Sequence, residues 1–135
     1  MYDNSRNDYY TNIYSSGAKG TGDGGAFTTA ADVERFWRGL FGGIIVNRET
    51  LRQMIVPQVP VNCFGYGLWL EKVAGRYFPH FEGCEDGISF MSTYDETDDL
   101  LVTLISNKGD NVWKLDREIL RGFYCDIPPY FYYGE

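Results

Sequence analysis

The sequence predicts an α+β fold in which helices flank an antiparallel sheet of three to four strands. Two observations support this class. Residues 29–43 carry a clear helical pattern, whereas apolar residues from about position 64 onward recur with period two, as they do in strands. The links between the expected strands are short and leave no room for crossover helices, which favours antiparallel pairing.

The first expected helix follows a glycine-rich turn. Thr29 is a suitable N-cap because its hydroxyl can accept a bond from a free first-turn N–H, and Asp32 resembles the partner residue of a capping box. Gly42 and Gly43 are expected to end the helix. Its apolar face consists of Val33, Phe36, Trp37, Leu40 and Phe41.

Capping residues, prolines and turns define the remaining elements. A second helix is expected over residues 47–56, with Asn47 as its cap and Pro57 beyond its end. A last helix begins near Asp110 or Asn111. It is expected to direct toward the sheet Val112, Leu115, Ile119, Leu120 and Phe123. The expected strands are 64–70, 76–82, 87–94 and 100–106. The last of these is an apolar run and is expected to be the most buried strand.

The 135 residues suffice for a single domain or for part of one. Residues 1–10 and 126–135 are expected to be loosely ordered, because the first segment has no regular period and the second follows the last helix and contains Pro128. A short strand is expected over residues 10–14.

Charge and cysteine content exclude several classes of protein. The net charge of −7 argues against nucleic acid or an anionic membrane as a partner. Three cysteines are an odd number, so no disulfide framework is predicted and a reducing, cytoplasmic location is favoured. The polar N-terminus does not resemble a signal peptide, so an export signal in an intact relative would lie upstream.

Four segments together resemble serine β-lactamase-like hydrolases and their penicillin-binding-protein relatives. The resemblance covers most of the chain, from about residue 12 to residue 120. It implies the C-terminal portion of such a hydrolase, whose intact form transfers acyl groups from a β-lactam, a D-alanyl peptide or another small ester or amide through a serine ester. The four segments are GDGGAFTTAADVERFW, FGYGLWL, FEGCEDGISF and LLVTLISNKGDNVWKL.

The resembled family uses an S-x-x-K motif and a Y-x-N motif for catalysis. In this chain the matches stand in reversed order and only a few residues apart, next to a glycine loop rather than on a rigid helix. We therefore expect nucleophile, lysine base and tyrosine to lie upstream, and the chain to be inactive alone. The literal matches are Ser16 with Lys19, Tyr10 with Asn12, and Tyr2 with Asn4.

By resemblance, Phe81, Glu82 and Gly83 occupy the place of the K-[ST]-G or H-x-G strand that lines the substrate cleft. Aligning Gly83 with the motif glycine puts Phe81 where the family has lysine or histidine. His80 then points to the opposite strand face unless a bulge rotates it. The family also implies that the backbone N–H of Cys84 supplies half of an oxyanion hole. A plain sheet strand remains an equally acceptable interpretation.

The sequence also allows two other functions. A non-catalytic module could hold a peptide or glycan on exposed aromatic rings, for which the candidates are Phe64, Tyr66, Trp69 and Tyr77. Gly20, Gly22 and Gly25 satisfy the dinucleotide pattern G-x-G-x-x-G, but a second helix follows where that site requires a parallel strand. No cofactor is therefore expected.

No metal site is expected either. Metal-ligating residue types occur without the usual zinc spacing; they are Cys63, His80, Cys84 and Cys125. The acidic run 95–99 lacks the glycine and final glutamate of an EF-hand and is interpreted as a solvated turn. The expected partners are the missing N-terminal part of the same fold or a second copy, with a small-molecule or peptide substrate in the intact protein.

Overall fold

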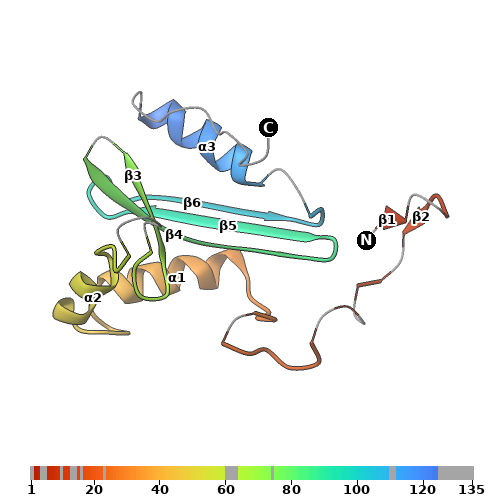
Figure 1. Cartoon of the computed structure of the whole chain (residues 1–135), viewed down its shortest axis with the longest axis horizontal. Helices are drawn as coiled ribbons and strands as arrows, with labels where there is room; N and C mark the ends of the chain where they lie inside the picture. The colour runs from red at the N-terminus through yellow and green to blue at the C-terminus, as the bar shows by residue number, and fades with distance from the viewer. Residues whose placement is uncertain are drawn as a thin grey trace.

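A computed structural model of the chain describes residues 2–3, 6–9, 11–12, 15, 17–22, 24–59, 64–73, 75–109 and 112–124. Its central layer is an antiparallel sheet with strand order β3-β4-β5-β6. Helix α1 (Ala30–Phe41) lies on one face of this sheet and helix α3 (Val112–Phe123) on the other (Figure 1). The predicted α+β class is confirmed. The four strands are Trp69–Val73, Arg76–Glu85, Ile88–Asp95 and Leu100–Ser106.

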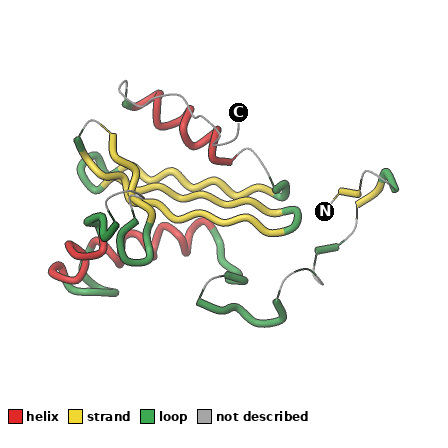
Figure 2. The backbone as a smooth tube through the Cα atoms, in the orientation of Figure 1, coloured by secondary structure: helices red, strands yellow, loops and turns green. Residues whose placement is uncertain are grey.

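The N-terminal segment contains one feature that the sequence did not predict. Strands β1 (Tyr2–Asp3) and β2 (Asp8–Tyr9) pair antiparallel, apart from the main sheet (Figure 2). No strand was expected at these positions of residues 1–10. In the strand expected over residues 10–14, Thr11 and Asn12 are not in a strand, and the other three positions lie outside the described residues. Residues 126–135 also lie outside them.

The N-terminus of α1 is built as predicted. Thr29 Oγ1 accepts a bond from the Asp32 N–H at 3.2 Å and donates to the Asp32 carboxylate at 2.8 Å. The hydroxyl thus satisfies one of the four N–H groups that a helix start leaves unpaired. The predicted apolar face is buried except for Phe36, which is 38% exposed at its margin.

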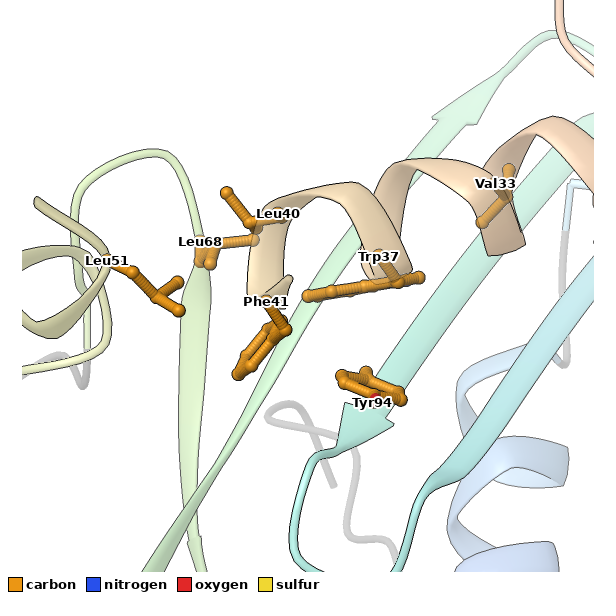
Figure 3. Packing of buried hydrophobic residues seen from close by; sticks show 7 residues of the cluster. All are labelled: Val33, Trp37, Leu40, Phe41, Leu51, Leu68 and Tyr94. Atoms are coloured by element: carbon orange, nitrogen blue, oxygen red, sulfur yellow. The ribbon is translucent and has the colours of Figure 1, made fainter. Parts of the chain in front are cut away.

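The face of α1 that meets the sheet is centred on Trp37, which is fully buried. Its indole N–H donates to Ser92 Oγ at 2.8 Å, and Ser92 in turn shares a 2.9 Å bond with Thr103. Because a buried N–H without a partner is costly, this bond fixes where the ring can sit. Figure 3 shows the surrounding buried cluster, which comprises Val33, Trp37, Leu40, Phe41, Leu51, Leu68 and Tyr94.

Helix α2 (Arg48–Met54) is shorter than expected, and β3 starts later than the predicted strand 64–70. The reason is a close approach between the two segments. The Tyr66 N–H donates to the Met54 carbonyl, and a Cβ added to Gly65 would lie 1.8 Å from that oxygen. Gly67 has a φ of +72°, which bends the chain again. Residues 64–68 therefore fold over the end of α2 instead of forming a strand.

The expectation that residues 100–106 form the most buried strand is wrong. Those residues form β6, which lies at one end of the sheet, and Val102 is its one buried residue. The most buried strand is β5, where all five residues from Met91 to Asp95 are buried. A continuous apolar run is compatible with an edge as well as with a centre, so hydropathy alone could not assign the position.

The face that α3 presents to the sheet also differs from the prediction. Val112 and Leu120 are buried as expected, but Leu115 is 51% and Phe123 63% exposed. Asp116, which is 1% exposed, takes the place between the two buried apolar residues. The buried stripe therefore has the spacing i, i+4, i+8 and contains a carboxyl group.

The close approach at Gly65 generates a stability prediction. We expect Gly65→Ala to lower the free energy of unfolding by about 2 kcal/mol or more, because the methyl group cannot fit against the Met54 carbonyl without backbone movement. Gly83→Ala is the matched control, since a Cβ there meets nothing within 4 Å. Urea unfolding of both variants measures the difference; equal stability would contradict the packing described for residues 64–68.

Candidate functional site

The candidate residues lie on the second half of β4, where the strand has a free edge. Strand β3 pairs with β4 only from Arg76 to His80. On its other side β4 pairs with β5 from His80 to Glu85. The outer edge of Phe81–Glu85 therefore has no strand beside it within the described ranges. Backbone N–H and C=O groups along such an edge can bind another extended chain.

Strand alternation divides the candidates between the two faces of the sheet. Phe81 faces α1, with its ring centroid 5.2 Å from that of Trp37. His80 is paired with Thr93, whose hydroxyl bonds to Asp116 on α3. The ladder through His80 is regular on both sides, so no bulge rotates its imidazole toward the α1 face. The structure therefore places Phe81, and not His80, on the α1 side of β4.

On the side that faces α1, the free edge carries an aromatic side chain, Phe81, and next to it a position, Gly83, that no other atoms fill. Phe81 packs edge-on against the ring of Phe36 at 5.5 Å and against Phe90 at 5.2 Å. Gly83 follows two residues later on the same face, and a Cβ there would meet nothing within 4 Å. The surface therefore combines a rigid apolar platform with a backbone that a ligand can approach closely.

Cys84 lies on the face away from α1. Its side chain is exposed, and Sγ donates to the carbonyl of Gly109 at 3.5 Å. No group of three potential metal ligands forms among the residues that the structure places. Cys63 and Cys125, the other cysteines considered for zinc, lie outside the described residues.

Thr93 and Asp116 form a polar cluster beneath α3 that the sequence pattern did not predict. Both carboxyl oxygens of Asp116 accept from the Thr93 hydroxyl, at 3.2 and 3.3 Å. Because one hydroxyl has one hydrogen, a buried carboxylate is poorly satisfied there. Desolvation by burial accordingly raises the pKa of Asp116 to about 7, against the Thr93 bond and with a further increase from the Glu82 charge. The sequence does contain one sign of this cluster, because Asp116 lies between Val112 and Leu120 in the apolar stripe of α3.

His80 and Glu82 lie on this same face. Desolvation by burial lowers the pKa of His80 to about 4, although the contact of Nδ1 with the Phe78 carbonyl at 3.4 Å acts the other way. Desolvation raises the pKa of Glu82, which is partly offset by a bond from Trp113. His80 is therefore a neutral, half-buried group at physiological pH on the sheet face that α3 covers.

Residues 96–99 of the acidic run form an exposed turn, as the sequence suggested, but Asp95 at the end of β5 departs from that expectation. Asp95 is only 8% exposed; it accepts from the Tyr124 hydroxyl at 2.7 Å and pairs with Arg76 at 3.3 Å. Asp99 pairs with Arg38 of α1 and accepts from the Tyr94 hydroxyl. The carboxylates anchor both helices to the turn and are not arranged around a cation.

The literal S-x-x-K and Y-x-N matches do not form a described site. Ser16, Tyr10 and Asn4 lie outside the described residues. Lys19 is exposed, and Asn12 donates through Nδ2 to the Asp86 carbonyl in the β4–β5 turn.

The glycine turn is closed by its own backbone. The Thr21 N–H donates to the Gly24 carbonyl at 2.8 Å, and Gly25 has a φ of +76°. A Cβ on Gly20 would lie 3.0 Å from the Gly25 carbonyl, so the glycine is explained by tight packing within the turn.

This sheet with helices on both faces has the fold of serine β-lactamase-like and penicillin-binding-protein-like hydrolases, and the resemblance seen in the sequence is confirmed. Among solved structures, the chain is similar over 90% of its length to a penicillin binding protein from Bacillus halodurans, with 26% identity and a TM-score of 0.81. A D-amino acid amidase from Ochrobactrum anthropi SV3, solved with D-phenylalanine, matches 70% of the chain at 23% identity and a TM-score of 0.52.

The chain spans 39% of the length of that penicillin binding protein and 34% of the amidase. No protein-family model and no curated protein matches the sequence. Within the described residues, no helix has the length and apolar character needed to cross a membrane.

The buried His80 and Asp116 generate a prediction for the pH dependence of stability. Asp116 has a folded pKa of about 7 against an ordinary value of 3.8, so its contribution falls as pH rises through that window. His80 has a folded pKa of about 4 against 6.5, so its contribution falls as pH drops. Between pH 4 and 6.5 the two slopes oppose each other.

We therefore expect each single variant to expose the other slope. Relative to the parent chain, Asp116→Asn should become more stable as pH rises from 4 to 6.5, and His80→Gln should become less stable. Each slope corresponds to about one proton, and urea unfolding at half-unit pH steps measures it. Parallel profiles for the parent and both variants would show that neither group titrates differently on folding.

Proposed function

We propose that this chain forms one wall of the substrate cleft of a β-lactamase-like serine hydrolase, as the C-terminal part of that fold, and is catalytically silent alone. In the intact protein the reaction would be acyl transfer through a serine ester, on a β-lactam, a D-alanyl peptide or another small ester or amide. The observation that carries this proposal is the free outer edge of Phe81–Glu85. By the sequence resemblance, this segment corresponds to the strand that lines the family's substrate cleft.

The edge supports binding rather than bond cleavage. An extended substrate can exchange backbone hydrogen bonds with it, while the Phe81 ring limits one side of the space and Gly83 leaves the other open. The Cys84 N–H would supply one donor to the developing oxyanion, with the nucleophile's own N–H as the other. With Phe81 in place of a cation, this wall would recognise substrate by shape and backbone contacts more than by charge.

The buried serines of the sheet are occupied in structural roles. Ser92 bonds to Trp37 and Thr103, and Ser89 donates to the Lys108 carbonyl at 2.6 Å. Both are fully buried, so a substrate carbonyl cannot reach either hydroxyl without unfolding the sheet. The nucleophile would therefore belong to the larger share of the fold that the penicillin binding protein has beyond the matched 39%.

Acylation by a β-lactam tests this proposal. We expect no covalent adduct after incubation of the chain with a labelled penicillin, measured by intact mass, because the proposed nucleophile lies outside this chain. A penicillin binding protein treated in parallel is the positive control. An adduct on the chain would overturn the proposal, and peptide mapping would then identify the nucleophile.

The alternative function is a non-catalytic peptide- or glycan-binding module on the same scaffold. The four aromatic candidates do not form one surface. Phe64 and Trp69 are in contact, with ring centroids 3.9 Å apart, whereas Tyr77 lies on the opposite face beneath Lys72. Tyr66 and Trp69 are 57% and 39% exposed. Among these four rings, only Phe64 and Trp69 are shown in contact, so they are the pair that offers neighbouring aromatic surface to a ligand.

Tryptophan fluorescence distinguishes this alternative from the cleft-wall function. If the module binds D-alanyl peptides or glycans at Trp69, titration should shift the emission without turnover, and Trp69→Phe should abolish the shift. Trp113→Phe is the matched control, because Trp113 lies on α3 and bonds to Glu82. A shift that persists in Trp69→Phe and disappears in Trp113→Phe would exclude the surface formed around Trp69.

A further inference from the structure

The proposed cleft segment, Phe81–Glu85, is held by a neighbouring strand on one side only. It pairs with β5, whereas the pairing of β3 with β4 stops at His80. The position of its backbone therefore also depends on side-chain contacts with the two faces of the sheet. Phe81 supplies such a contact on the α1 face, where its ring lies 5.2 Å from that of Trp37. Gly83 has no side chain and supplies none.

Glu82 supplies the corresponding contact on the face that α3 covers. Its carboxylate accepts a hydrogen bond from the side chain of Trp113, the second residue of α3. The charge of Glu82 also raises the pKa of Asp116, which lies three residues further along the helix. Both interactions place the Glu82 carboxylate beneath the N-terminal half of α3. The free segment is therefore held from the α1 face at Phe81 and from the α3 face at the next residue.

Helix α3 is itself anchored on the two strands that flank β4. Arg117 forms an ion pair with Glu71 of β3, and Asp116 accepts from the Thr93 hydroxyl of β5. Neither contact involves a residue of the free segment. The helix is therefore a support whose position is set by other strands, and it can hold β4 without depending on it.

The strand register explains why α3 reaches the free segment through Trp113. In the sheet pairing, the two anchors of α3 lie at the levels of Phe78 and His80, so the helix runs antiparallel to β4. Three residues back along the helix from the second anchor cover about 4.5 Å. Two residues onward along β4 from His80 cover about 6.6 Å. Trp113 therefore lies near the level of Glu82, beyond the last residue that β3 supports.

We propose that Trp113 is a positioning residue of the cleft wall, which holds Glu82 from α3 and so fixes the edge of β4 that a ligand would meet. The inference rests on the proposed function only in assigning this edge to the cleft. Trp113 acts through Glu82 and touches no ligand in this role. Without the contact, a strand paired on one side can bend at Gly83. Binding through backbone hydrogen bonds requires atoms held to within about 0.5 Å, so such bending would weaken it.

The bond from Trp113 stabilises the charged form of Glu82. Desolvation raises the pKa of this carboxyl group, and the bond opposes that increase. Its titratable neighbours among the described residues are His80, on the same face of β4, and Asp116 of α3, whereas Met91 is opposite on β5. Loss of the indole N–H should therefore raise the pKa of Glu82. Loss of ring packing alone would not produce this shift.

Amide hydrogen exchange of the chain, measured residue by residue by NMR, tests the proposal. Trp113→Phe removes the N–H and keeps an aromatic ring. We expect the amides of residues 82–85 that bond to β5 to exchange at least about threefold faster in this variant, the size expected for losing one hydrogen bond. Glu82→Ala, at an exposed position, should have the same local effect. The two changes combined should add nothing further, because they remove the same bond.

Two further variants control for side-chain chemistry and charge. In a Glu82→Gln background, which keeps an acceptor, Trp113→Phe should still accelerate exchange. Glu118→Ala removes one carboxylate from the exposed side of α3 and should leave exchange at residues 82–85 unchanged. If the effects of Trp113→Phe and Glu82→Ala multiply, or if exchange rises equally over the whole sheet, the proposal is overturned, because the ring would then support α3 packing in general.

NMR titration of the Glu82 carboxyl group provides a second measurement. Its pKa should be higher in Trp113→Phe than in the parent chain, and an unchanged pKa would also overturn the proposal. A covalent adduct in the acylation assay would instead overturn the proposed function and leave the coupling between Trp113 and Glu82 intact. None of the exchange or titration readouts needs a ligand, so the two failures are distinguishable.

Discussion

The docking of Trp37 onto the sheet is the interaction on which the rest of the structure depends. The ring is fully enclosed, and its single polar atom has a partner in Ser92, on the best-covered strand. Tyr94 and Phe81 contact the same ring, from β5 and β4 respectively. One side chain therefore sets the height of α1 above the sheet and also holds the aromatic platform beside the free edge of β4. Core packing and the proposed cleft wall share one set of contacts.

Local signals predicted those elements whose ends are determined locally. Thr29 and Asn47 cap the two helices as expected, and the bounds of β6 coincide with the apolar run over 100–106. Prediction failed where a distant segment decides the outcome. Gly65 and Gly67 look like members of an alternating strand, but contact with Met54 on another element converts that stretch into a bend. Such a contact has no signature in a window of neighbouring residues.

The candidate site shows the same division. Period-two alternation placed His80 and Phe81 on opposite faces, which agrees with the observed register. The bond between Thr93 and Asp116 joins residues 23 positions apart, and the pairing of Arg76 with Asp95 depends on the register of β4 against β5. These polar contacts require the strand order and the rotation of α3, which apolar periodicity did not predict. The catalytic part of the family mechanism has no described counterpart in the chain.

The turn between β5 and β6 joins two layers that otherwise contact different sheet faces. Tyr124, at the end of α3, bonds to Asp95, and Arg38 of α1 reaches Asp99. Surface turns usually tolerate inserted residues and new chain ends because little depends on their backbone. Here a lengthened turn would move Asp99, the anchor of α1, relative to Asp95, which holds α3 from the end of β5. This acidic, exposed turn looks like the least constrained hairpin connection of the sheet. Because a helix is anchored on it, its length is the least free to change during evolution.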